Sequence, residues 1–171
     1  MFISKNFFPG LFLAALAALP AAWAVAQSPK KAAVFDLELI DTSLEGEIKG
    51  KNAAESERLR LASESLRREL VGTGVYVLVD RAPAADAIKA AGFLHGCNGC
   101  EADIARALGA DIAVTGTVHK VSNLILNINV TVTDVATRQR LAAASVDIRG
   151  NTDESWIRGV SYLVRNRLSG K

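Results

Sequence analysis

The sequence predicts an α/β (α+β) protein built on a mixed sheet of about five strands that ends in a three-stranded antiparallel meander. The first observation is residues 109–150, where apolar and polar side chains alternate with the period of two that marks strands with one buried face. The second is that the upstream segments switch between short strand-like runs and stretches with apolar residues three and four apart, as in amphipathic helices. The predicted order is β-α-β-α-α-β-β-β-α, with the helices packed on the sheet.

The N-terminal segment has the layout of a secretory signal peptide. Lys5 precedes an apolar run over residues 7–19, Pro20 interrupts that run, and Ala24 and Ala26 supply an A-x-A cleavage site. A membrane anchor is the alternative, but a spanning helix needs about 20 apolar residues without a break. We therefore expect cleavage after Ala26 and Sec-dependent export to the periplasm.

The exported chain, residues 27–171, has the size of one domain. The 20 basic and 18 acidic residues of the full sequence are interspersed, and Lys5 is the only charged residue within the expected signal peptide, residues 1–26. A nearly neutral chain without a basic block is not typical of nucleic-acid-binding proteins. No later apolar run is long enough to span a membrane. We expect a single soluble periplasmic domain.

The first two elements are predicted by their apolar spacing. Residues 32–40 alternate and predict a strand, and the glycine-rich, charged segment after them predicts a loop. Asn52 or Ser56 is positioned to cap the next helix, and Gly72 and Gly74 end it. The apolar stripe of this helix consists of Leu59, Ala62, Leu66 and Leu70.

Three short elements are predicted between this helix and the meander. Residues 75–80 predict a strand, residues 84–91 a small helix, and residues 101–108 another helix that Gly109 ends. A final helix is expected after the meander. Its expected core residues are Trp156, Val160, Leu163 and Val164.

The only two cysteines, Cys97 and Cys100, stand three positions apart in the loop between the two short helices. In an exported protein, this spacing is expected to give a disulfide that closes a small loop. A metal site is an alternative, because His95, Cys97 and Cys100, with His119 as a fourth ligand, offer the donors that copper and zinc prefer. A thiol-redox pair would need a helix N-terminus at the first cysteine to lower its pKa, and the predicted helix begins at or after the second.

The polar face of the meander is a second candidate surface. Its members are Thr115, Thr117, His119, Asn127, Asn129, Thr131, Thr133, Ser145, Asp147 and Arg149. His119 and Asp147 are the residue types of an acid–base pair, but no nucleophile stands beside them, which disfavours a hydrolase. We expect a solvated face, with partner binding or strand addition as the functional alternative.

The third candidate is the charged segment RGNTDESWIRG, residues 149–159. Its partner-binding candidates are Arg149, Asn151, Asp153, Glu154, Trp156 and Arg158. The spacing of Asn151 and Glu154 predicts a capping box, and Trp156 is expected in the core. The three remaining charged residues, Arg149, Asp153 and Arg158, lie near the start of a helix. There they could bind a carboxylate-bearing or anionic partner.

Four strings in this chain resemble a family of exported proteobacterial proteins that carries only a domain-of-unknown-function label. They are VFDLELIDTSLEG, CNGCEADIARALGAD, GTVHKVSNLILNINVTVTDVATRQ and RGNTDESWIRG. More remotely, the pattern of GAD, two strands, an Asp-Val-Ala-Thr turn, a strand and a helix is similar to the TolB N-terminal domain and to the curli-secretion-channel type of periplasmic domain. This resemblance implies a mixed sheet flanked by helices, and action through protein contacts at the cell envelope rather than catalysis. Those relatives commonly have Thr-Gly at the turn, where this chain has Thr137-Arg138.

These features predict a non-catalytic periplasmic binding or accessory protein for a cell-envelope or secreted enzyme system. We expect a protein partner, no nucleic-acid partner and no cofactor. The alternative is a metal-handling (copper or zinc) or thiol-redox protein that uses the loop containing His95, Cys97 and Cys100.

Overall fold

The computed structural model describes residues 28–169, and the predicted signal peptide lies outside them. The strands are β1 (Lys30–Val34), β2 (Glu38–Asp41), β3 (Tyr76–Leu78), β4 (Ile112–Ser122), β5 (Ile125–Asp134) and β6 (Arg140–Arg149). They form one mixed sheet in the order β3-β1-β4-β5-β6, and β2 pairs with β4 further along the same side as β1. The pairs that involve β1 and β2 are parallel, whereas β4, β5 and β6 form the antiparallel meander. The predicted fold class and order of elements are confirmed.

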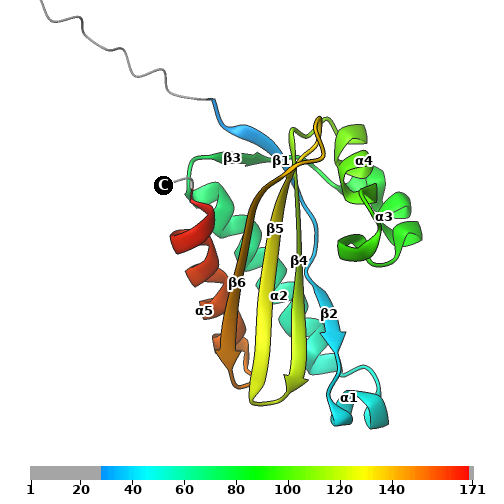
Figure 1. Ribbon diagram of the computed structural model, residues 1–171, viewed down its shortest axis with the longest axis vertical. Helices are drawn as coiled ribbons and strands as arrows, with labels where there is room; N and C mark the ends of the chain where they lie inside the picture. The colour runs from blue at the N-terminus through cyan, green and yellow to red at the C-terminus, as the bar shows by residue number, and fades with distance from the viewer. Residues whose placement is uncertain (1–27, 170–171) are drawn as a thin grey trace, which may run out of the picture.

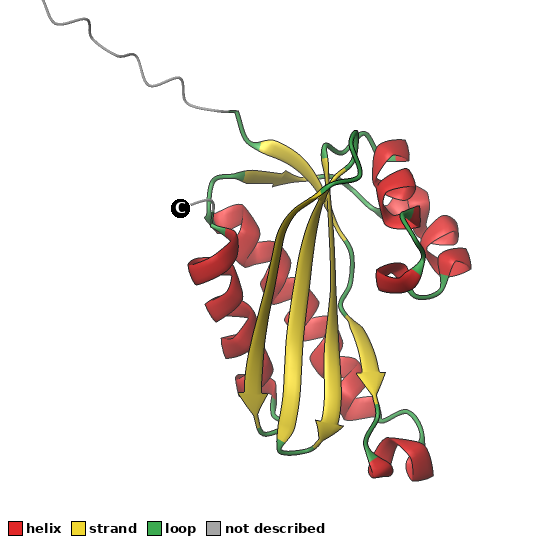
Figure 2. Ribbon diagram, viewed as in Figure 1, coloured by secondary structure: helices red, strands yellow, loops and turns green. Residues whose placement is uncertain are grey.

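The helices are α1 (Leu44–Lys49), α2 (Ala53–Gly72), α3 (Ala85–Ala91), α4 (Cys100–Ala107) and α5 (Asp153–Leu163). Short 3-10 turns span Ala82–Ala84 and Leu94–Gly96, and a π-helical turn, Val164–Leu168, continues α5. The two longest helices, α2 and α5, lie side by side behind the sheet (Figures 1 and 2). Helices α3 and α4 lie beside β1 and the upper part of β4, away from α5 (Figure 1).

Each face of the sheet has its own hydrophobic core. The larger core lies between the sheet and α2 with α5, and its fully buried side chains include Leu66, Ile128 and Trp156. The smaller core joins the opposite face to α3 and α4 through Phe35 and Leu94, among others. Because the smaller core covers only the upper end of that face, the polar residues of the lower meander are left without a covering helix.

The predicted first strand is broken in two, which makes six strands rather than five. Uninterrupted alternation over residues 32–40 predicts Phe35 and Leu37 on one face, but Phe35 belongs to the smaller core and Leu37 to the larger one. The break is stabilised by side chains: Ser63 accepts a hydrogen bond from the Leu37 N–H at 2.9 Å, and Arg67 pairs with Asp36 at 2.6 Å. Strand β2 then resumes against β4, where Glu38 faces Thr117 in register.

Two local predictions differ from the structure, and the conformation of one turn is now defined. Part of the expected loop after the first strand forms α1, because Ser43 caps it by accepting a hydrogen bond from the Gly46 N–H. The alternation of the meander predicts Leu124 on the buried face with Leu126 and Ile128, but Leu124 lies in the β4–β5 turn and is 72% exposed. At the Thr137-Arg138 turn, Arg138 takes the left-handed conformation with φ of 58°, a conformation that favours glycine.

Candidate functional site

A groove runs between the outer edge of β6 and helix α5, which we call the β6–α5 groove. It has a volume of about 650 Å³. Its lining residues are Val146, Asp147, Ile148, Arg149, Thr152, Glu154, Ser155, Arg158, Gly159, Tyr162 and Arg165. Strand β6 ends the sheet on this side, and no other strand of residues 28–169 pairs with its outer edge (Figure 1). The groove therefore combines the last four residues of a free strand edge, residues 146–149, with the side of a helix.

The backbone of β6 presents hydrogen-bonding groups to this groove. Gly150, just after β6, donates its N–H to the carbonyl of Leu124, the residue just before β5. In an antiparallel pair these bonds alternate, so the N–H and C=O groups of Arg149, Asp147, Ser145 and Ala143 point away from β5, to the free edge. Such an edge is a ready template for one more strand.

Arginine side chains surround this edge. Arg149, Arg158 and Arg165 line the groove with two acids, Asp147 and Glu154. The Arg158–Glu154 ion pair spans 2.8 Å but is more than three-quarters exposed on both sides, so solvent screens it. Arg149 is exposed, and no ion pair to it is found among the described residues. The groove thus holds guanidinium groups that an acidic partner can reach.

The structure divides the six residues of the predicted partner-binding segment into two sets. Arg149, Glu154 and Arg158 line the β6–α5 groove. The other three face inward or toward α2: Trp156 is fully buried and donates its indole N–H to Asn151 at 3.1 Å, and Asp153 pairs with Arg58 at 2.9 Å. Those side chains secure the junction of β6 and α5 against α2, and they orient the groove without lining it.

The helix cap at this junction uses different residues from those predicted. The N-cap of α5 is Thr152, and its capping box is completed by Ser155 rather than by Asn151 and Glu154. Asn151 instead donates to Glu55 at 2.6 Å and to Asn123 at 3.0 Å. The amide nitrogen of Asn151 thus bonds to elements far apart in the sequence, and its amide oxygen accepts from the nearby Trp156 and from Arg58 on α2 at 3.4 Å.

Sequence reasoning missed a buried charged cluster next to this junction. Lys120, 1% exposed, lies 2.6 Å from Glu55, which is itself 2% exposed, and 3.2 Å from Asp41. Glu45 lies at 3.6 Å on the exposed side. The cluster joins the end of β4 to α1 and to the start of α2, and it is the polar boundary of the larger core.

The cluster is held in its charged state. Burial lowers the pKa of Lys120, but the carboxylates of Glu55 and Asp41 outweigh it and raise the pKa above the ordinary value. Burial raises the pKa of Asp41, but hydrogen bonds from Ser43 and the nearby Lys120 ammonium hold it below the ordinary value. Both shifts favour the charged forms of Lys120 and Asp41, so their contact is a structural ion pair that links β4 to β2.

A second groove lies at the opposite edge of the sheet, next to β2; we call it the β2 groove. Its volume is about 430 Å³. Its lining residues are Glu38, Leu39, Asp41, Gly46, Gly50, Lys51, Asn52, Glu55, Ser56, Leu59, Gly92 and Phe93. Phe93 is 56% exposed at its rim. Three carboxylates and one exposed lysine give this groove an acidic character, opposite to that of the β6–α5 groove.

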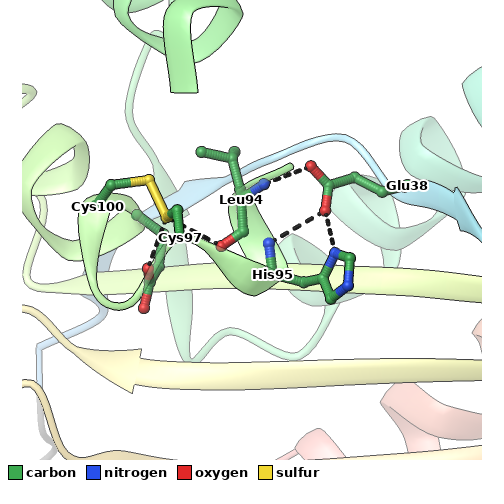
Figure 3. The surroundings of a disulfide bond; sticks show 6 residues. Glu38, Leu94, His95, Cys97 and Cys100 are labelled. Atoms are coloured by element: carbon green, nitrogen blue, oxygen red, sulfur yellow. Dashed lines mark hydrogen bonds and ion pairs between the residues drawn. A yellow bond between two sulfur atoms is a disulfide. The ribbon is translucent and has the colours of Figure 1, made fainter. Parts of the chain in front are cut away.

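Cys97 and Cys100 form a disulfide, as the spacing predicted (Figure 3). Gly99, between them, has φ of 103° and begins the turn into α4, which starts at Cys100. With both sulfurs bonded to each other, no thiolate is available to a metal ion in this oxidised state. Within the part of the chain that the structure describes, the one cluster of three metal-capable side chains comprises these cysteines and Glu101.

His95 points away from the disulfide, toward Glu38 (Figure 3). The Glu38 carboxylate accepts hydrogen bonds from the N–H groups of Leu94 and His95, at 2.6 and 3.1 Å, and lies 2.8 Å from His95 Nδ1. This carboxylate ties the cysteine-containing turn to β2. His119 lies elsewhere, with Nε2 3.0 Å from the hydroxyl of Thr42, so the four predicted metal ligands do not converge.

The polar face of the meander is occupied by its own hydrogen bonds. Asn127 donates to Ser145 at 2.9 Å and to Asp147 at 2.7 Å. His119 and Asp147 each face Asn127 in register, from opposite sides, so a whole strand separates them. The two residues therefore form no acid–base pair, and the face is a hydrogen-bonded surface.

The fold is shared with solved bacterial proteins of low sequence identity. The LpoB C-terminal domain from Salmonella enterica matches with a TM-score of 0.53 and 17% identity, covering 74% of this chain and 87% of that domain. Lipoprotein GNA1162 from Neisseria meningitidis gives 0.52 and 15%, covering 84% and 99%. The PelC dodecamer from Paraburkholderia phytofirmans gives 0.51 and 10%, covering 81% and 89%. TolB from Acinetobacter baumannii also matches, with 16% identity and coverage of 85% and 29%, but its TM-score of 0.43 supports no argument.

No curated protein matches the sequence. Within residues 28–169, no helix has both the length and the apolar character that crossing a membrane requires. One family model, DUF3280, with the description "Protein of unknown function (DUF2380)", matches residues 30–168, which is most of the chain. The resemblance predicted from four sequence strings is thus confirmed, and the protein is a member of the DUF3280 family.

Proposed function

We propose that this protein is a non-catalytic accessory protein of the bacterial cell envelope, exported to the periplasm, which acts by binding a polypeptide in the β6–α5 groove. The observation that carries the proposal is the free edge of β6 beside a groove lined by three arginines. An extended segment that pairs with β6 gains main-chain hydrogen bonds, while its side chains contact α5. Acidic side chains of that segment would meet Arg149 and Arg158.

The solved structures with this fold support an envelope role. GNA1162 is described as a lipoprotein, a class of proteins attached to membranes, and PelC is described as a dodecamer, which shows that a chain of this fold can form an assembly. The chain's own predicted signal peptide agrees with export. We assign the binding role to the edge of β6 because its contacts, unlike those of the buried charged cluster, are available at the surface.

The test is affinity capture of the tagged, exported protein from periplasm under mild conditions. In Ala143→Pro, the proline removes one outward-facing N–H from the free edge and leaves the bonds to β5 in place. Ala143→Val keeps that N–H and is the matched control. We expect wild type and Ala143→Val to retain the same partner, and Ala143→Pro to lose most of it.

A second pair of variants tests the arginines. Arg149→Glu reverses a charge in the groove, whereas Arg140→Glu reverses one at the other end of the same strand. Capture should fall for Arg149→Glu and persist for Arg140→Glu. Recovery of no partner by the wild type, or equal recovery by all four variants with intact folding, would overturn the proposal.

A further inference from the structure

We propose that the β6–α5 groove receives the β2 edge of a second copy of this chain, so that copies associate head to tail. The inference rests on the proposed function, because it names the partner of the same groove. Four features of the β2 and β6 edges support it: their matching position in the strand register, their direction, their charge, and their exposed aromatic residues.

The β2 and β6 edges occupy matching positions in the register of the sheet. Register pairs link Asp41 to Lys120, Lys120 to Leu126, and Leu126 to Ile148. Along the same path, Glu38 corresponds to Ser145 through Thr117 and Asn129. The four residues of β2 therefore stand level with residues 145–148 of β6, and a second copy shifted sideways along the sheet brings these segments together.

The two edges also run in the same direction. Strand β2 is parallel to β4, and β6 is parallel to β4 because two antiparallel steps separate them. Addition of β2 of one copy to β6 of another is then a parallel pairing, which places α2 of the first copy on the same side of the joined sheet as α5 of the second. The N–H of Thr42 bonds to Lys120 on β4, so alternation leaves the backbone groups of Leu39 and Asp41 free on the outer side.

The charges of the two grooves are opposite. Glu38, Asp41 and Glu55 line the β2 groove, and they remain in excess even when Lys51 and the buried Lys120 are counted against them. Arginines outnumber acids in the β6–α5 groove by three to two. Contact between unlike grooves joins opposite charges, whereas contact between two β6 edges joins like charges, so head-to-tail association is favoured over a symmetric β6–β6 dimer.

An exposed aromatic side chain stands in each groove. Phe93 in the β2 groove is 56% exposed, and Tyr162 in the β6–α5 groove is 46% exposed. Large aromatic residues with this exposure are typical anchors of protein interfaces. A contact that uses two different surfaces leaves one free at each end, so it continues until a ring closes or a filament forms.

The experiment uses two blocked variants of the exported chain. The edge-blocked variant is Asp147→Pro/Arg149→Glu, in which the proline removes an outward-facing N–H within residues 145–148, and it retains an intact β2 groove. The groove-blocked variant is Phe93→Lys, which places a cation opposite the arginines and retains an intact β6 edge. Val71→Lys, at a residue 47% exposed on α2 and outside both grooves, is the matched control. Sedimentation velocity over a concentration series measures the assembly state of each.

We expect wild type and Val71→Lys to assemble into the same species, and each blocked variant to stay monomeric alone. An equimolar mixture of the two blocked variants should form a 1:1 dimer, because one intact groove meets one intact edge. Three results would overturn the inference: a monomeric wild type, a Phe93→Lys protein that still assembles, or a mixture that stays monomeric. Retained capture of a different protein through β6 would then leave the proposed function standing, so the two failures are distinguishable.

Discussion

The ammonium of Lys120 lies 2.6 Å from Oε1 of Glu55, and both side chains are almost completely buried. Because a buried charge without its partner keeps its full desolvation cost, Glu55→Leu should lower the free energy of unfolding by about 3 kcal/mol or more. The double variant Lys120→Met/Glu55→Leu should lose less than the sum of the two single variants. Urea denaturation of all four proteins gives the coupling energy, and additive losses would contradict a coupled pair.

The same cluster makes stability depend on pH at both ends of the range. The folded pKa of Asp41 lies below its ordinary value of 3.8, so its contribution is present above that pH and is lost as pH falls through the folded value. The folded pKa of Lys120 lies above 10.5, so its contribution is present below that pH and is lost as pH rises through the folded value. The contribution of these two groups to the unfolding free energy should be nearly constant between these limits.

Asp41→Asn tests the acidic side. Its amide oxygen can still accept the Ser43 N–H, but the charge opposite Lys120 is gone, so its stability should fall less steeply between pH 5 and pH 3 than that of wild type. Asp86→Asn, at an exposed residue of α3, is the control and should retain the wild-type slope. Equal slopes for all three proteins would show that Asp41 does not carry this pH dependence.

Periodicity predicted the meander because one rule, alternation, holds along it without interruption. The same alternation through Ile112, Val114 and Val118 places Lys120 on the buried face, so the sequence did contain a signal for the buried lysine. Its partner was not predictable: Glu55 lies 65 residues earlier in a helix, and no local spacing connects them. Long-range electrostatic pairs of this kind depend on tertiary packing.

The break in the first strand shows a different limit. Alternation placed Phe35 with Leu37, because a continuous strand sends every second side chain to one face. Contacts of Ser63 and Arg67 from α2 hold residues 36–37 out of the strand pairing. The side chain of Leu37 therefore lies on the opposite face of the sheet from that of Phe35. The candidate site was predicted only in part. The local crowding of charged residues identified Arg149 and Arg158, but the free edge of β6 beside them depends on strand order, which local sequence does not show.

Helix α5 packs so closely on the sheet that Gly159 has no room for a side chain. A Cβ at this position would lie 2.8 Å from Ile148 and 3.0 Å from Ile128, both in the larger core. Gly159→Ala should therefore lower the free energy of unfolding by about 1–2 kcal/mol. Gly72→Ala, in the last turn of α2 with nothing within 4 Å of its Cβ, should raise it by about 0.5–1 kcal/mol. Thermal or urea unfolding compares the two, and a Gly159→Ala protein as stable as wild type would contradict the close packing.

The disulfide between Cys97 and Cys100 should be important for stability but dispensable for binding. Its closed loop is very short, so the chain-entropy model gives a loss of about 2 kcal/mol for Cys97→Ser/Cys100→Ser. Glu38 still ties the turn to β2 through the N–H groups of Leu94 and His95, so we expect the variant to fold and to capture the same partner as wild type. A chelator should leave the melting temperature of the oxidised wild type unchanged.

Native mass spectrometry of the exported protein, taken without reductant or chelator, decides between this expectation and the metal or redox alternative. A disulfide mass with no bound metal agrees with a structural role. A stoichiometric metal with both thiols reduced, or a folded double-serine variant that no longer captures its partner, would show that the cysteines take part in the function. In that case His95 would be the next residue to mutate, because its imidazole lies beside the disulfide loop and contacts Glu38, which ties that turn to β2.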